Sequence, residues 1–344
     1  MIVQNYNNLD TLVYLPTKSY GEDATLKKRA RSKIWTQAIN SKLMRLDSVN
    51  ARMYKRAYYC CDGIEQEGTT LKSKYCNSRS CNICNRIRTA KMMNGYIPQM
   101  KGTHQFVTLT IPNVKANELR EAIQKMIKTS SNIIRTLRER QGLKPNGIRK
   151  IEVTYNSKRK DYHPHLHILI DCEESAHQLI IRWLDKYPLA KIEAQDIRQA
   201  DQDSFNELFK YTTKIGERVS GKQELEVNIK ALDTILVATR NLRVFQPFGN
   251  IKKQSEEITA EDLTKQEYKV PYKEHGSFIW IGHDWREINT GQFLTYTEKP
   301  TFKIIDTSEY DPPPKKLSYN TTKVLRDTRF NLLKHGNEMQ QLWN

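Results

Sequence analysis

The sequence contains no run of apolar residues long enough to cross a membrane, and no secretory signal peptide is recognisable at its start. It also contains no internal repeat. Its six cysteines do not resemble a disulfide framework, because five of them lie between residues 60 and 84. The length of 344 residues is sufficient for two or three domains. We therefore expect a soluble cytoplasmic protein with reduced thiols and no membrane partner.

Acidic residues are scarce in the N-terminal part of the chain. The whole sequence carries 56 Lys and Arg against 39 Asp and Glu, a formal net charge of +17. Residues 26–105 alone carry 17 basic and 4 acidic residues, which accounts for +13 of this excess. A solvated helix surface does not require such asymmetry, whereas a phosphate-rich partner favours it. The charge pattern therefore predicts a protein that binds nucleic acid.

Histidine is also rare, with eight in the chain, yet His163, His165 and His167 stand at alternate positions. Alternate residues of a β-strand point to the same face, so these three imidazoles would lie side by side. The residues between and after them, Leu166 and Ile168, would form an apolar opposite face. A strand whose histidines only meet solvent is the alternative. The grouping of so few histidines favours a metal site.

Two further strands are predicted, at 106–111 and 151–155, and each has one apolar and one polar face. Helical spacing of apolar residues is found at 119–137 and 174–187, and 192–197 has strand character. The order strand, helix, strand, strand, helix, strand, helix predicts an α+β fold with a ferredoxin-like open antiparallel sheet. Helices would cover one face of this sheet, and the other face would stay open.

The third metal ligand is predicted from the faces of these strands. Glu152 would share the open face with His165 and His167, on a neighbouring strand. Its carboxylate is equally compatible with a plain surface role, and His163 competes for the ligand role because Pro164 leaves the local geometry open. Two imidazoles and one carboxylate leave positions free for a phosphate oxygen. Imidazole suits Mn²⁺, while Mg²⁺ prefers oxygen ligands and water.

A candidate nucleophile lies on the segment 203–216, which has helical spacing of its apolar residues. Ser204 and Glu207 have the spacing of a capping box. Tyr211 faces away from the apolar stripe, with Glu207 four residues before it and Lys214 one turn after it. The carboxylate can accept a proton, and the ammonium can stabilise developing negative charge. A capping role for Glu207 is the alternative, and both roles can coexist.

The cysteines have metal-ligand spacing. Cys76, Cys81 and Cys84 supply three thiols, and Cys60 or Cys61 would complete a tetrahedral zinc site. Free buried cysteines are the alternative. Basic residues around the cluster and in the charged hairpin loop at 156–161 predict contacts with the DNA backbone. These residues are Arg79, Arg86, Arg88, Lys91, Lys158, Arg159 and Lys160.

Several of these motifs occur in the order found in one family. The matching pieces are Phe106-Val-Thr-Leu-Thr110, Glu152-Val-Thr-Tyr-Asn156, His163-Pro-His-Leu-His167 and Glu207-Leu-Phe-Lys-Tyr-Thr-Thr-Lys214, together with the cysteine segment and Leu242–Gly249. The chain resembles the rolling-circle plasmid replication initiators of the Gram-positive type 1 group, which are single-tyrosine members of the HUH endonuclease superfamily. The likeness covers residues 50–250. The family often has Cys-Pro-x-Cys where this chain has Cys81-Asn-Ile-Cys84.

The resemblance implies a metal-dependent nicking and strand-joining enzyme that acts at a plasmid double-strand origin. Tyr211 would attack one phosphodiester, leaving a 3′-hydroxyl primer and a 5′-phosphotyrosine link, and Glu207 would activate water for the terminating cleavage. Host helicase and polymerase would be partners, and a homo-oligomer is compatible with this role. An HUH transposase or relaxase is the alternative within the superfamily. A non-catalytic, zinc-containing DNA-binding regulator is the alternative outside it.

The predicted organisation has four parts. Residues 1–25 form a polar arm, 26–100 a basic helical and zinc-binding segment, 101–250 the nicking domain, and 251–344 a C-terminal accessory region. Within them we expect a long basic helix at 25–56, a helix at 227–244 and a strand at 278–281. A linker is expected at 312–314 and a last helix at 321–342.

Overall fold

The computed structural model describes residues 24–210, 217–218, 224–258, 270, 272–297 and 303–308. Among these residues the chain forms two compact units. The cysteine unit contains the described residues up to Gly95, those within 213–237 and those within 254–309. The histidine unit contains those within 96–212 and 238–253. No helix in the described part of the chain is long and apolar enough to cross a membrane.

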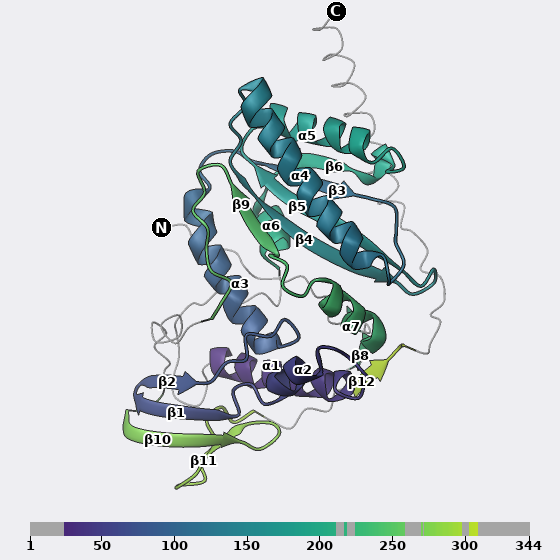
Figure 1. Cartoon of the computed structure of the whole chain (residues 1–344). Helices are drawn as coiled ribbons and strands as arrows, with labels where there is room; N and C mark the ends of the chain where they lie inside the picture. Colours follow the sequence, from purple (N-terminus) through teal and green to yellow (C-terminus); the bar gives the residue numbers. More distant parts are fainter. Residues whose placement is uncertain are drawn as a thin grey trace, which may run out of the picture. The chain divides into compact units, whose positions relative to one another are not determined.

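The histidine unit is built on one five-stranded sheet (Figure 1). Its strand order is β6-β3-β5-β4-β9, and every neighbouring pair is antiparallel. The strands are β3 (Gln105–Thr110), β4 (Gly147–Asn156), β5 (Asp161–Ile170), β6 (Asp196–Gln199) and β9 (Phe245–Phe248). With the helices α4 (Leu119–Gln141) and α5 (Glu173–Lys186), the chain order is β3-α4-β4-β5-α5-β6. This is the ferredoxin-like order, and the predicted α+β class is confirmed.

The two faces of this sheet have different neighbours. Arg149 donates hydrogen bonds to the carbonyl oxygen of Ile127 (2.9 Å) and to Ser130 (2.8 Å), both of which belong to α4. The next residue of β4, Lys150, points to the opposite face. There it reaches the carbonyl oxygen of Glu207 in α6 (Gln202–Phe209) at 2.7 Å. Helix α4 therefore covers one face, and α6 lies on the face that carries the histidines.

Local sequence signals explain where the helices of this unit end. Helix α4 ends at Gly142, which has the left-handed conformation (φ +68°) that glycine adopts without a steric penalty. Helix α5 ends before Tyr187-Pro188, as expected for a residue pair that disfavours helix. Helix α6 differs from the prediction, because its capping box pairs Asp201 with Ser204. Glu207 is therefore not part of a capping box, and its carboxylate is not needed for capping.

The cysteine unit contains helices and two small sheets (Figure 1). The four-stranded sheet has the order β11-β10-β1-β2, and the three-stranded sheet has the order β12-β8-β7. The helices are α1 (Ala24–Leu43), α2 (Ala51–Tyr58), α3 (Asn82–Tyr96, which reaches the unit boundary) and α7 (Ile229–Ala238). The strands are β1 (Gly63–Gly68), β2 (Thr70–Ser73), β7 (Glu217–Arg218), β8 (Glu224–Val227), β10 (Lys273–Trp280), β11 (Trp285–Glu287) and β12 (Lys303–Asp306). Short 3₁₀ turns at Ile97–Gln99 and Ile192–Ala194 belong to the histidine unit.

Two predicted helices are shorter than expected. The helix predicted at 25–56 is interrupted between α1 and α2, where Ser48 donates a hydrogen bond to Asp233 (2.6 Å) and accepts one from the Asn50 amide (3.1 Å). Side chains of this kind offer the backbone an alternative to the helix. Of the helix predicted at 227–244, only α7 is observed. It starts later than predicted because Val227 is the last residue of β8. The arm at 1–25 lies almost wholly outside the described residues, and the linker at 312–314 and helix at 321–342 lie entirely outside them.

The C-terminal part of the chain is not separate from the cysteine segment. Strand β10 pairs with β1 in antiparallel register, from Gly63 opposite Ile279 to Gln66 opposite Gly276. The predicted boundary at residue 251 therefore differs from the division in the structure, which joins 63–73 and 273–287 in one sheet. Pairing between segments two hundred residues apart leaves no local signal in the sequence.

Gly147 is a position where the sheet has no room for a side chain. A Cβ atom there would lie 2.2 Å from the Leu169 carbonyl oxygen and 2.4 Å from the Phe248 ring. We expect Gly147→Ala to destabilise the protein by about 3 kcal/mol, because backbone and ring must both move. Gly63→Ala is the matched control on β1, where nothing lies within 4 Å of the added atom. Urea denaturation should show a lower midpoint for Gly147→Ala only; equal midpoints would contradict the packing described here.

Candidate metal centres

The histidine unit brings three donor side chains together on one face of its sheet. This face is partly covered by α6, so it is not open as the sequence predicted. Glu152 on β4 is the register partner of His165 on β5, and Thr108 on β3 is the partner of His167. One ligand atom each from Glu152, His165 and His167 lie within 4.8 Å of one another, and all three residues are buried. The Nε2 atom of His167 is 3.8 Å from Oε2 of Glu152. The pleat of two adjacent strands thus produces a compact set of donors.

Hydrogen bonds orient both imidazoles. Nδ1 of His167 is 3.2 Å from Oγ1 of Thr108, and Nδ1 of His165 is 3.2 Å from the carbonyl oxygen of His163. With both Nδ1 atoms engaged, Nε2 is the nitrogen that each ring can offer to a metal. Such secondary contacts usually fix the tautomer and the direction of a ligating histidine.

The electrostatics of the site suit a cation. Burial lowers the pKa of His167 to about 3 and also lowers the pKa of His165, so both rings are neutral near pH 7. Burial alone would raise the pKa of Glu152, but the neighbouring Lys150 ammonium acts in the opposite direction. The net result is a carboxylate with a pKa below its usual value. Two neutral imidazoles and one anion are a donor set that fits Mn²⁺.

His163 lies next to this donor set but outside it. Its Nδ1 atom is 3.0 Å from Oδ1 of Asn113, and its ring stacks on His165 with centroids 5.3 Å apart. The compact group of ligand atoms contains Glu152 in its place. Of the two residues considered for the third ligand, Glu152 therefore lies within the donor set and His163 lies outside it.

The predicted catalytic helix is described only as far as residue 210. Glu207 lies in the last turn of α6, with its side chain 36% exposed and Oε2 4.0 Å from Nζ of Lys210. Its charge raises the pKa of His165, against the larger and opposite effect of burial. Tyr211 and Lys214 lie outside the described residues.

Lys150 is a residue of this site that the sequence patterns did not reveal. Its side chain is 0% exposed, and Nζ donates to Oε2 of Glu152 at 2.9 Å. Lysine is rarely fully buried, so a buried position is not expected from its identity. The sequence signal that could have placed Lys150 in the site is its spacing. It lies two residues before Glu152, and such residues share a face of a strand.

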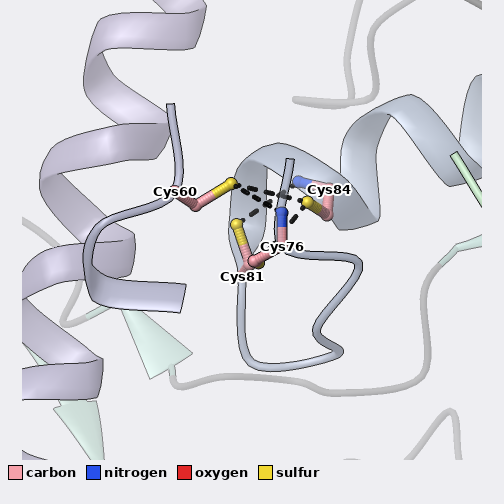
Figure 2. Close-up of side chains that lie close together, drawn as sticks. All are labelled: Cys60, Cys76, Cys81 and Cys84. Atoms are coloured by element: carbon pink, nitrogen blue, oxygen red, sulfur yellow. Dashed lines mark hydrogen bonds between the residues drawn. The ribbon is translucent and has the colours of Figure 1, made fainter. Parts of the chain in front are cut away.

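The cysteine unit contains a second donor set, formed by Cys60, Cys76, Cys81 and Cys84 (Figure 2). Their sulfur atoms lie within 4.8 Å of one another, and Sγ of Cys84 is 3.7 Å from the sulfurs of Cys60 and Cys76. Hydrogen bonding among the thiols, together with burial, raises the pKa of Cys60. Burial would also raise the pKa of Cys81, but hydrogen bonds from the other thiols lower it. Four sulfurs this close can hold a metal ion, and four sulfur ligands suit Zn²⁺.

The structure also separates the two cysteines between which the sequence left a choice. Cys60 contributes its sulfur to the group, whereas Cys61 does not. Cys61 has a positive φ of 61° and donates its backbone N–H to the carbonyl oxygen of Lys74 (3.1 Å). Backbone amides support the group, since those of Cys76 and Ser78 point at the sulfurs of Cys60 and Cys76 at 3.4 and 3.3 Å.

The basic residues predicted to contact DNA lie in different environments. Arg88 is buried and donates to the carbonyl oxygens of Glu256 (2.7 Å) and Asn77 (2.8 Å), so it supports the fold of the cysteine unit. Arg79 lies 3.4 Å from the Glu256 carboxylate. Internal hydrogen bonds are also made by Arg86, to Ser32, and by Lys91, to the Glu257 carbonyl. In the histidine unit, Lys158, Arg159 and Lys160 are exposed at the turn between β4 and β5.

Replacing His165 tests the first donor set directly. We expect His165→Ala to weaken Mn²⁺ binding by at least about 100-fold, because it removes one of three donors from a buried site. Isothermal titration with MnCl₂ measures the affinity without any DNA. His177→Ala is the control, since His177 lies on α5 outside the site, where its Nδ1 contacts the Glu173 carbonyl oxygen. Equal affinities for both variants would show that His165 is not a ligand.

Comparisons with known proteins place the chain in a family. A curated relative from Staphylococcus aureus, named Protein rep, is 31% identical over 48% of this chain and 81% of its own length. Another Protein rep, from Streptococcus pneumoniae serotype 2, is 30% identical over 33% of this chain and 38% of its own length. A third, from Lentilactobacillus hilgardii, is 25% identical over 60% and 79% of the two chains. No solved structure matches significantly. The family model described as Replication protein (Rep_1) matches residues 68–291, a span that includes the Glu-His-His set and three of the four clustered cysteines, and the chain therefore belongs to this family.

Proposed function

We propose that this replication protein initiates rolling-circle replication of a plasmid by nicking one strand at the origin. The observation that carries the proposal is the arrangement of Glu152, His165 and His167 on the sheet face that also holds α6. Helix α6 carries Glu207 and ends two residues before Tyr211. The Glu-His-His set and the Glu207 carboxylate are therefore carried by neighbouring elements, and Tyr211 follows the end of α6 in the sequence.

The chemistry is a transesterification at phosphorus. Glu152, His165 and His167 would hold a divalent cation, Mn²⁺ or Mg²⁺, which would supply polarisation of the phosphodiester and offset its negative charge. The Tyr211 oxygen forms a bond to phosphorus, and the bond from phosphorus to the 3′-oxygen breaks. The products are a 5′-phosphotyrosine link and a free 3′-hydroxyl that can prime synthesis. Glu207 is proposed to take the phenol proton and, at termination, to activate water for a second cleavage.

The remaining groups have supporting roles in this proposal. Lys214 would stabilise negative charge on the phosphate. The cysteine group would bind zinc and keep its segment folded, and exposed basic residues such as Lys158, Arg159 and Lys160 would contact the DNA backbone. The partners that follow are plasmid origin DNA and the host helicase and polymerase that extend the primer.

The proposal is tested by locating the covalent link in the unaltered protein. The full chain is incubated with Mn²⁺ and the supercoiled plasmid that carries its gene, then digested with nuclease and trypsin. Mass spectrometry should find one nucleotide phosphate on the peptide that contains Tyr211, and sequencing should find one nick position. A nucleotide on another tyrosine would assign the nucleophile elsewhere. Bound but intact plasmid would instead favour a DNA-binding regulator without catalysis.

A further inference from the structure

Lys150 lies beside Glu152, His165 and His167 on the same face of the sheet, and we call the face formed by these four residues the metal-binding face. Its register partner on β5 is His167, just as His165 is the partner of Glu152. Partners directly opposite each other on antiparallel strands have neighbouring side chains. Glu152, His165 and His167 are possible ligands for a cation, whereas Lys150 is itself a buried cation. A buried ammonium costs free energy, so its position calls for a role that an apolar residue would not fill.

The ammonium of Lys150 joins two elements of the proposed active site. Nζ donates to Oε2 of Glu152 at 2.9 Å and to the backbone carbonyl oxygen of Glu207 at 2.7 Å. Glu207 belongs to the last turn of α6, whose carbonyl groups generally lack partners within the helix. A cation at this end of a helix is also favoured by the helix dipole. One side chain therefore holds both the carboxylate of the donor set and the end of the helix that leads to Tyr211.

We infer that Lys150 is a positioning residue that fixes the distance between the metal-binding carboxylate and the end of α6. The inference rests on the proposed nicking function, because it assigns Lys150 a part in aligning Tyr211 with the phosphate. Lys150 touches neither DNA nor the reacting atoms in this role. It acts through Glu152 and through the backbone of Glu207.

The test compares metal affinity with reaction rate in Lys150→Met, which keeps the length of the side chain but removes the ammonium. We expect the single-turnover nicking rate at saturating Mn²⁺ to fall at least about 30-fold, because the end of α6 is released. Mn²⁺ affinity, measured by isothermal titration without DNA, should rise by about three- to tenfold, because the Glu152 charge is no longer offset by a neighbouring ammonium. A rate that falls while affinity rises is not the signature of general damage to the fold.

Arg149→Met is the matched control. Arg149 is the adjacent residue of β4 and is also buried, but its guanidinium bonds to Ile127 and Ser130 of α4, on the other face of the sheet. Its loss should lower the melting temperature while leaving Mn²⁺ affinity and the rate per folded molecule within about twofold of wild type. If Lys150→Met merely loses stability in the same way, or nicks at the wild-type rate, the inference is wrong.

Lys150→Arg covers the case in which Lys150→Met does not fold. The charge is kept, so Mn²⁺ affinity should stay within about twofold of wild type. The nicking rate should still fall at least about fivefold, because a planar guanidinium cannot reproduce the two contacts of the ammonium. A wild-type rate in this variant would also overturn the inference. The proposed function is judged separately: it fails if wild-type protein forms no link at Tyr211, whatever the Lys150 variants do.

Discussion

Tyr211→Phe is expected to abolish covalent attachment to DNA, with the rate falling at least about 10⁴-fold, while binding of origin DNA stays within about twofold of wild type. The change removes one oxygen atom and no charge, so the electrostatic attraction between the positively charged protein and DNA phosphates is unaltered. The reaction loses its nucleophile, because phenylalanine offers no oxygen that can form a bond to phosphorus. The Glu152, His165 and His167 set is also unchanged, so Mn²⁺ affinity should equal that of wild type.

The measurement is a denaturing gel of protein incubated with radiolabelled plasmid and Mn²⁺, run beside a filter-binding assay of affinity. Tyr187→Phe is the matched control, because it removes the same atom from a tyrosine packed on Trp183, 4.5 Å between ring centroids. Its hydroxyl makes one long contact, 3.4 Å to Thr129 of α4. That variant should attach to DNA at the wild-type rate. Undiminished attachment by Tyr211→Phe would remove Tyr211 from the mechanism.

The grouping of Glu152, His165 and His167 on one sheet face could be predicted from the sequence, because strand periodicity is a local property. A period of two puts His165 and His167 on one face, and the same period puts Glu152 on the polar face of the preceding strand. A short connection between two strands makes them antiparallel neighbours, so Glu152 comes opposite His165. The α+β class follows from the same reasoning. Periodicity does not reveal Lys150, since the predicted strand began one residue after it.

The features that the sequence did not predict depend on competition or on distant pairing. Ser204 has a possible capping partner three residues before it and another three residues after it. The capping box forms with Asp201, the residue before it. Cys60 and Cys61 are chemically identical neighbours, so only the path of the backbone decides which sulfur joins the group. The pairing of β1 with β10 joins two segments that, along the sequence, precede and follow the described residues of the histidine unit. These outcomes are set by tertiary structure rather than by local residue patterns.

Removal of the zinc ion proposed for the four clustered cysteines is expected to unfold the cysteine unit. The four sulfurs come from three segments: Cys60 follows α2, Cys76 follows β2, and Cys81 and Cys84 lie at the start of α3. The apolar core here includes Cys60, Cys81 and Cys84, together with Ile64, Phe278 and Trp285, and Cys76 packs against it. Structural zinc in small domains contributes about 10–16 kcal/mol of apparent binding free energy, much of which is folding free energy. A chelator should therefore abolish the near-ultraviolet circular dichroism of Trp280 and Trp285.

Serine variants of three cysteines make this prediction specific. Cys84→Ser and Cys60→Ser should each lose zinc, measured by atomic absorption, and should lower the melting temperature by at least about 10 °C. Cys61→Ser should retain one zinc ion per chain, because its sulfur is not in the group. Cys172→Ser should retain zinc and full stability, since Cys172 caps α5 by accepting a hydrogen bond from the Ser175 amide, and serine caps helices well. Zinc-free wild-type protein with an unchanged melting temperature would show that the four thiols support the core without a metal.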